Sequence, residues 1–141
     1  MSVTRQDTMY PFAEQFVVTS EGKTSITLTT LKADAVVTHC QVEIVTAATG
    51  TADLTVGAGS DADGLIAASD ATATAGTIYG DAVADLGDDW KVATGASSGY
   101  TLMPGGVKYV ANTAITFVLS AAPTTEGVYV VTLAGFKGQA E

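Results

Sequence analysis

The stretch VVTHCQVEIVT, residues 36–46, decides the fold class because it alternates with period two along its whole length. Its even-numbered residues are predicted to share one face of a β-strand: Val36, Thr38, Cys40, Val42 and Ile44. The odd-numbered residues between them, such as His39 and Gln41, face the other way. Because β-branched side chains favour half-buried, pleated positions, we predict a long strand with one buried face.

Four further stretches show strand patterns, with turn signals between them. They are residues 24–30, 51–56, 115–120 and 128–136, the last of which is apolar on both faces apart from Thr132. Turn formers such as Glu21-Gly22 and Pro104-Gly105-Gly106 separate them. No long window has the 3.6-residue apolar period of a helix. Many short strands with polar turns predict an all-β fold, an antiparallel β-sandwich, with a jelly roll as the first choice.

Two stretches depart from this pattern. Residues 57–86 are rich in Ala, Gly, Asp and Thr, and we expect an elaborated loop there with a short helical turn around residues 64–69. Residues 1–16 are expected to form an irregular N-terminal arm, which leaves residues 17–141 as the β-sandwich domain. The bulky apolar residues of this arm indicate that it anchors the protein to another surface and does not enter the sandwich core.

The charge balance excludes several classes of function. The 141 residues include 6 Lys+Arg and 15 Asp+Glu, which gives a formal net charge of −9. Nucleic-acid binding is disfavoured because a phosphate backbone requires a basic surface. No apolar run approaches the ~20 residues of a membrane-spanning helix, and residues 1–15 lack the apolar segment of a signal peptide. Only 15% of the residues are charged, against roughly 25% in an average domain, so the surface suits coverage by a partner.

Two motifs invite a catalytic or metal-binding interpretation. His39 and Cys40 are adjacent, but neighbouring strand residues point to opposite faces and cannot form a nucleophile–base pair. The run Asp61-Ala62-Asp63-Gly64 resembles the start of a calcium loop, although Asp70 stands where that loop requires a closing Glu. Acidic residues around a turn glycine more often form Asx turns, and we favour that interpretation.

A run of aspartates precedes Trp90, the only tryptophan. Trp90 with Tyr79 or Tyr100 would make a stacking platform for a sugar, whereas the alternative is a solvated acidic loop with Trp90 buried as an anchor. We favour burial. The Pro104-Gly105-Gly106 turn lacks the Lys and the helix of a phosphate loop. We expect no catalytic, cofactor-binding or metal-binding residues, and therefore no enzyme.

The order of strands and turns carries a resemblance. The strand at residues 37–46 leads through residues 47–50 to the strand at 51–57 and the acidic turn at 60–66, and later the strand at 114–120 is followed by residues 125–131. This succession resembles the small β-sandwich virion proteins of tailed bacteriophages, of the capsid decoration (cement) or head-fibre type. The resemblance covers about residues 24–136.

The resemblance implies a structural protein on the outer surface of the capsid, commonly a homotrimer, assembled in the host cytoplasm. Its partner would be the major capsid protein, and its role would be to clamp neighbouring capsid subunits. The alternative is a carbohydrate-binding jelly-roll domain for host-surface recognition. More apolar residues are present than one small core can hold, so a covered patch is expected. The candidate interface residues are Met9, Tyr10, Phe12, Phe16, His39, Gln41, Tyr129 and Val131.

Overall fold

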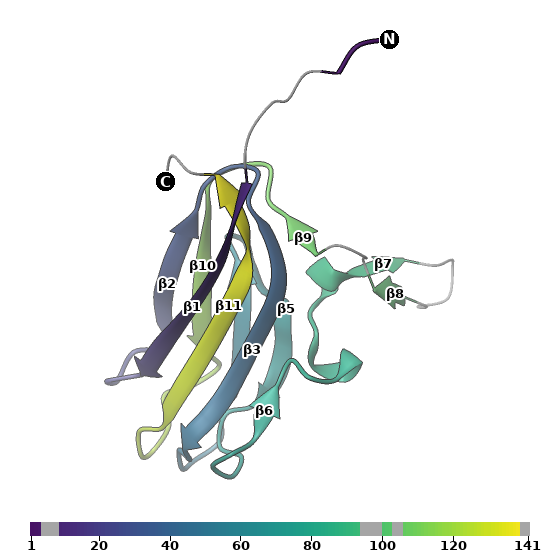
Figure 1. The fold of residues 1–141 in the computed structure, drawn as a ribbon. Helices are drawn as coiled ribbons and strands as arrows, with labels where there is room; N and C mark the ends of the chain where they lie inside the picture. The colour runs from purple at the N-terminus through teal and green to yellow at the C-terminus, as the bar shows by residue number, and fades with distance from the viewer. Residues whose placement is uncertain (4–8, 94–99, 103–105, 139–141) are drawn as a thin grey trace.

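Two antiparallel sheets lie face to face in the computed structural model, which describes residues 1–3, 9–93, 100–102 and 106–138 (Figure 1). Short 3₁₀ turns, η1 (Val83–Asp85) and η2 (Asp88–Trp90), follow the sixth strand. The strands are β1 (Met9–Thr19), β2 (Ser25–Leu31), β3 (Val36–Thr46), β4 (Asp53–Ala58), β5 (Asp61–Asp70), β6 (Ile78–Tyr79), β7 (Lys91–Ala93), β8 (Tyr100–Leu102), β9 (Val107–Lys108), β10 (Thr113–Leu119) and β11 (Val128–Gly138).

The order of the strands is that of a jelly roll. The first sheet has the order β1-β11-β3-β6, with β9 also beside β3, and the second has the order β2-β10-β4-β5. The chain crosses from the first sheet to the second between β1 and β2, returns at β3, and crosses again at β4, and β10 and β11 pair with the early strands. Two such interlocked Greek keys define the jelly roll. The antiparallel β-sandwich predicted from the sequence is therefore confirmed.

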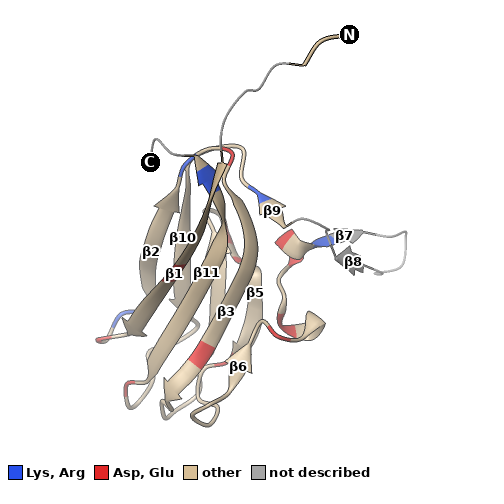
Figure 2. Ribbon diagram, viewed as in Figure 1, with Lys and Arg blue, Asp and Glu red and all other residues tan. Residues whose placement is uncertain are grey.

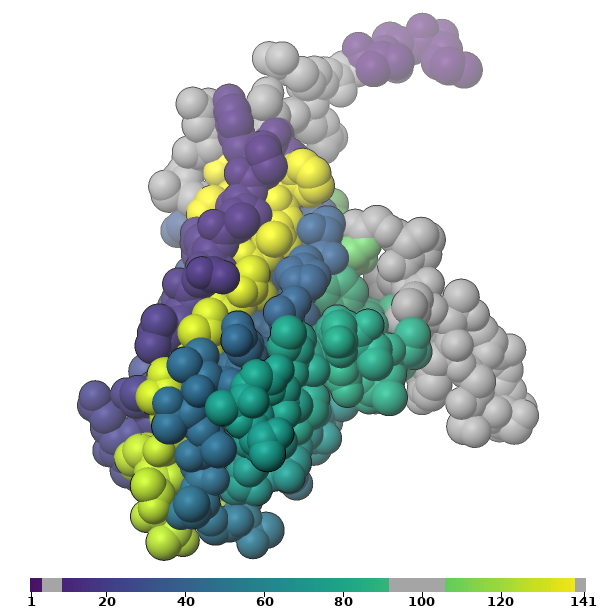
Figure 3. All heavy atoms as spheres, turned by 60° about the horizontal axis from the view of Figure 1, so that its bottom comes forward, coloured from purple at the N-terminus to yellow at the C-terminus, as the bar shows by residue number. Residues whose placement is uncertain are grey.

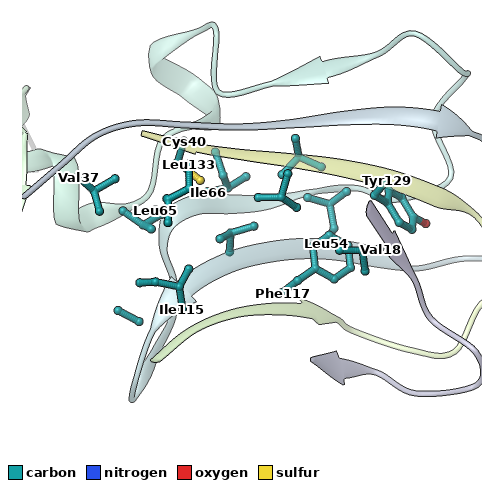
Figure 4. Close-up of a cluster of buried hydrophobic side chains, with 14 of the residues drawn as sticks. Val18, Val37, Cys40, Leu54, Leu65, Ile66, Ile115, Phe117, Tyr129 and Leu133 are labelled. Atoms are coloured by element: carbon teal, nitrogen blue, oxygen red, sulfur yellow. The ribbon is translucent and has the colours of Figure 1, made fainter. Parts of the chain in front are cut away.

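The core fills the space between the two sheets (Figure 4). The inward residues of β11, Tyr129, Val131 and Leu133, are fully buried and face Phe117 and its neighbours on β10. The Phe117 and Tyr129 rings lie 5.2 Å apart between centroids in a tilted arrangement, as aromatic pairs prefer. The Tyr129 hydroxyl donates a hydrogen bond of 2.9 Å to the carbonyl oxygen of Ala71, which satisfies its one buried polar atom.

A bulge in β3 corrects the predicted alternation at one end of that strand. Ala134 of β11 pairs with His39, but Gly135 pairs with Val37, so Thr38 is left over. Val37 therefore turns into the core with Cys40, while Thr38 is exposed. A Cβ on Gly135 would collide with the carbonyl oxygen of Val36, so glycine is required where the two strands approach.

The N-terminal arm expected at residues 1–16 is wrong for Met9–Phe16. These residues belong to β1, which pairs with β11 in unbroken register from Met9↔Gly138 to Thr19↔Val128. The pattern was hidden because Glu14 interrupts the inward series Phe12, Phe16 and Val18. Its carboxylate lies 3.0 Å from the ammonium of Lys137, which also lies over the Phe12 ring, so the charge is neutralised at the edge of the core. The expected domain boundary at residue 16 falls inside a strand.

The stretch expected as a loop at residues 57–86 contains a complete strand, β5, in place of the helical turn around residues 64–69. Beyond β5, residues 71–90 cross the side of the sandwich that is formed by β3 and β5, and we call them the crossing segment. The Gly76 N–H donates a hydrogen bond to the carbonyl oxygen of Ile44 (2.7 Å), and the Ile44 N–H donates one to the carbonyl oxygen of Thr77 (2.9 Å). Further along, Gly87 N–H donates to Leu65 of β5 (3.1 Å). This crossing segment therefore covers the edges of both sheets on one side.

Candidate interaction surface

His39 and Cys40 lie on opposite faces of β3, as predicted. Cys40 is 2% exposed, and its burial raises the pKa of the thiol to about 12, so the thiol stays protonated and unreactive at neutral pH. His39 is exposed on the outer face, where it pairs across the sheet with Ala134. These two residues cannot act together on a substrate.

Aspartates gather around Gly64 at the start of β5. A Cβ at Gly64 would lie 2.5 Å from Asp89 Oδ2 and 3.0 Å from Asp61 Oδ2, so only glycine leaves room for both carboxylates. The Tyr109 hydroxyl donates to Asp89 Oδ2 at 3.0 Å, and burial raises the pKa of Tyr109, so it remains a donor. A hydrogen bond with Asp63, together with the nearby charge of Asp89, raises the pKa of Asp61.

This cluster does not form the calcium loop that the sequence motif suggested. Asp61 and Asp70 stand at opposite ends of β5, about 30 Å apart for an extended strand of that length, and cannot hold one ion. Within the described parts of the chain, no three His, Cys, Asp or Glu side chains are arranged to bind a metal. The Asp70 carboxylate instead accepts from the N–H and hydroxyl of Thr72, as an Asx turn does, and these bonds lower its pKa.

Trp90 is buried, as we favoured, and is not available as a sugar-stacking platform. It is 7% exposed, and its indole N–H donates a hydrogen bond of 2.8 Å to the carbonyl of Leu65. Tyr79 donates to the carbonyl of Asp70 at 2.8 Å, and the side chain of Tyr100 lies outside the described part of the structure. The carbohydrate-binding alternative therefore loses its central residue.

The structure separates the predicted interface residues into two groups. Tyr129 and Val131 are wrong as interface residues, because both are fully buried in the core of a single chain. The sequence of β11 is apolar on both faces, and the structure buries its odd-numbered residues from 129 to 135 and turns the even-numbered ones outward. The remaining six all belong to β1 or β3. Met9, Phe12, Phe16 and Gln41 are half-buried, and Tyr10 and His39 are exposed.

The sheet formed by β1, β11 and β3 has few charged residues, and we call its outer face the front face (Figure 2). Across it, Val17 pairs with Val130, and Gln15 pairs with Thr132, to whose hydroxyl it donates at 3.3 Å. Glu43 is the one Asp, Glu, Lys or Arg that these three strands point outward. Sequence reasoning missed Val17, which is 73% exposed, because no strand was predicted at residues 9–19.

Negative charge is concentrated away from the front face. Residues 53–91 contain eight aspartates and a single lysine, and they form β4, β5 and the crossing segment with η1 and η2. Figure 2 shows these acidic positions away from the front face. The chain is therefore electrostatically two-sided, with a neutral sheet face and an acidic flank.

The described residues line a small hollow at one end of the sandwich. A hollow of about 50 Å³ lies between the β1–β2 turn and β10, well below the ~300–1,000 Å³ of typical ligand sites. In the same portion of the chain, no helix is long and apolar enough to cross a membrane.

Comparison with known proteins gives a fold relationship. No family model matches the sequence, and no curated protein shows significant similarity to it. A chain of the cyanophage Pam1 capsid asymmetric unit superposes with a TM-score of 0.55 and 18% identity, covering 97% of this chain and 91% of that one. A chain of the acidic stable capsid of Helicobacter pylori bacteriophage KHP30 gives a TM-score of 0.49 and 13% identity, over 92% and 93% of the two chains. This protein therefore shares its fold with a component of a phage capsid.

Proposed function

We propose that this chain is a structural protein of a tailed-phage virion, which binds the outside of the capsid and clamps neighbouring subunits of the major capsid protein. The observation that carries the proposal is the jelly roll shared, over nearly the whole chain, with a component of the cyanophage Pam1 capsid. Since fold alone does not define function, the surface of the molecule must supply the rest of the argument.

The front face is the surface that we assign to the capsid. Among Asp, Glu, Lys and Arg it presents only Glu43, and it exposes Val17 and Phe136 (44% exposed). A surface of this kind binds through apolar and backbone contacts, which are little screened by salt. The acidic flank would then face solvent and keep coated particles apart by mutual repulsion.

Several copies acting together would hold the shell more strongly than one. We assign a homotrimer to the protein, so that each bound unit presents three front faces to the lattice. Linked contacts raise the overall affinity through effective concentration without any new kind of contact. A protein that binds the assembled shell and not its separate subunits stabilises the shell by mass action, without turnover of a substrate.

Binding to capsids tests this assignment. In Thr132→Lys, a charge is placed at the centre of the front face, opposite Gln15 and Gln41. We expect this variant to lose co-sedimentation with capsids that lack the protein. The matched control is Ala68→Lys, because Ala68 is exposed on β5 of the other sheet. Equal binding by both variants, with circular dichroism showing that both are folded, would contradict the assignment of the front face.

The same preparations address host-surface recognition as the competing function. A glycan-binding domain would associate with host cells or glycan arrays and leave capsid binding to another protein. We expect the wild-type chain to bind capsids and not glycans. Glycan binding without capsid binding would replace the structural proposal.

A further inference from the structure

We propose that copies of this chain associate through the side of the sandwich bounded by β1 and β2, with the edge strand of one copy pairing with an edge strand of another. This inference concerns contacts between copies. It holds or fails independently of whether the front face binds a capsid.

The two sides of the sandwich differ in how their sheet edges are covered. On the far side, backbone groups of the crossing segment bond to Ile44 of β3 and Leu65 of β5, and Leu86 forms a bridge with Ile66. Strand β9 covers the other end of β3 by pairing with Val36 and Val37. Part of the backbone at the edge of each sheet is thus paired there.

The opposite side of the sandwich, bounded by β1 and β2, has no such cover from the described parts of the chain. We call it the open side, and we call the side with the crossing segment the closed side. Among the described residues, β1 pairs only with β11, and β2 pairs only with β10, so each strand presents one unpaired edge. These are not short strands, because β1 has 11 residues and β2 has 7. Figure 3 shows β1, in purple, running along the flank of the molecule beside the yellow β11, away from the teal crossing segment.

These edges lack most of the features that keep edge strands from pairing. Natural edges are usually blunted by lysines, prolines, bulges or short length. In β1 the only charged residue is Glu14, which is paired with Lys137, and Pro11 lies near the beginning of the strand. The sequence of β2, SITLTTL, has neither charge nor proline, although a bulge interrupts its pairing with β10. A long uncharged edge is a template for addition of another strand.

The charge distribution indicates that the added strand comes from a second copy. Two molecules of charge −9 repel each other in most orientations. Eight of the aspartates lie in residues 53–91, on or near the closed side. The open side carries a nearly balanced set of charges: Glu14, Glu21, Asp34 and Glu126 with Lys23, Lys32 and Lys137. Pairing through the open sides therefore places the acidic flanks as far apart as the fold permits.

Edge pairing of this kind can form a closed oligomer of few copies, because each copy has two free edges and both lie on its open side. Around a two-fold axis, β1 would pair with β1 and β2 with β2 of the other copy. Around a three-fold axis, β1 of each copy would pair with β2 of the next. The homotrimer proposed above corresponds to the second arrangement, and both arrangements leave no free edge.

Sedimentation velocity of the full chain at micromolar concentration tests the proposal. We expect a species larger than the 14.2 kDa monomer, and a trimer if β1 pairs with β2 of the next copy. The double variant Ser25→Lys/Thr27→Lys places like charges on β2, the edge that pairs in both arrangements, and leaves the front face unchanged. It should weaken association by about tenfold or more. Ala68→Lys is again the control, since it adds charge to an exposed residue away from the open side.

Hydrogen exchange distinguishes strand addition from contact through side chains alone. Association through edges should protect backbone amides of β1 and β2 in the assembled wild-type protein, relative to the dissociated double variant. A monomeric wild-type chain, or an assembly that the double variant leaves intact, would overturn the proposal. A dimer would retain edge pairing and replace the three-fold arrangement. Loss of association with retained capsid binding would show that the two surfaces act separately.

Discussion

Single residues secure the connections that the strands alone do not determine. Glu126 illustrates this at the turn between β1 and β2, where Glu21 and Gly22 both have positive φ, 48° and 79°, and Lys23 N–H bonds back to the carbonyl of Ser20. The Glu126 carboxylate accepts hydrogen bonds from the Ser20 hydroxyl and from the backbone N–H groups of Glu21 (3.2 Å) and Gly22 (2.9 Å). A residue distant in sequence thus holds the first crossover of the jelly roll.

Replacing Glu126 with alanine should lower the free energy of unfolding by about 1–3 kcal/mol, because three donors lose a charged acceptor and that of Ser20 is buried. Urea denaturation measures the change. Glu43→Ala removes from the front face a carboxylate that has no ion-pair partner among the described residues. It should change the free energy of unfolding by less than about 0.5 kcal/mol. Equal effects of the two substitutions would show that the Glu126 hydrogen bonds do not stabilise the turn.

The carboxylates around Gly64 give the protein a pH response at the residue scale. Since the pKa of Asp61 is raised in the folded chain, the folded state binds its proton more readily than the unfolded state does. This contribution to stability is present below the unfolded pKa of about 3.8 and is lost as the pH rises through the folded value. Asp61→Asn should therefore stabilise the protein at pH 7 and have little effect near pH 3.

Denaturant titrations at the two pH values measure this difference. Asp81→Asn serves as the control, because Asp81 is exposed and is not among the charges that raise the pKa of Asp61. An Asp61→Asn effect that is the same at both pH values would contradict the raised pKa of Asp61.

At the scale of elements, the sequence predicted strands wherever apolar alternation was uninterrupted. Residues 36–46 form β3 with the predicted bounds, and 128–136 form most of β11. The prediction of strands from the sequence failed where tertiary contacts override the local pattern. Glu14 hid β1 because its partner Lys137 lies at the far end of the chain, and the acidic DADG motif hid β5 because it resembles a turn. The bulge at Thr38 depends on the register with β11, which no single strand encodes.

The candidate surface was predicted less completely than the fold. His39 and Gln41 were placed on the outer face because alternation in β3 assigns them there. Tyr129 and Val131 were misplaced because an apolar strand reads alike on both faces, and only the packing of the sheets selects which set is buried. The front face becomes one continuous, nearly uncharged surface only when β1 pairs with β11. Since the sequence did not predict that pairing, it did not predict the extent of the face.

Truncation separates β1 from the residues that precede it. Deleting residues 1–8 should leave the protein folded, because β1 begins at Met9. Deleting residues 1–16 removes most of β1 and of its pairing with β11. It also removes Phe12 and Phe16, which are half-buried against the core and each contribute part of the roughly 1.5–3 kcal/mol of a fully buried side chain. Against a typical total of about 5–15 kcal/mol, that loss should abolish cooperative thermal unfolding. Retention of a sharp transition in the longer deletion would contradict the role of β1.

At the scale of the whole molecule, the protein combines a neutral sheet face, an open pair of edges and an acidic flank. Charged residues lie mostly in turns and in residues 53–91, while the front face offers only Glu43. Contacts made by such a face depend on shape and apolar area more than on ion pairs. Their strength should therefore persist at about 1 M salt, where charges are screened beyond ~3 Å.

The resistance of phage capsids to heat and osmotic shock tests the structural role most directly. Particles with and without this protein are compared in low salt and in 1 M salt, with released DNA as the readout. We predict that particles carrying the protein withstand higher temperatures and steeper shocks in both salts, because binding to the assembled shell opposes its separation. Identical resistance with and without the protein would contradict the clamping role.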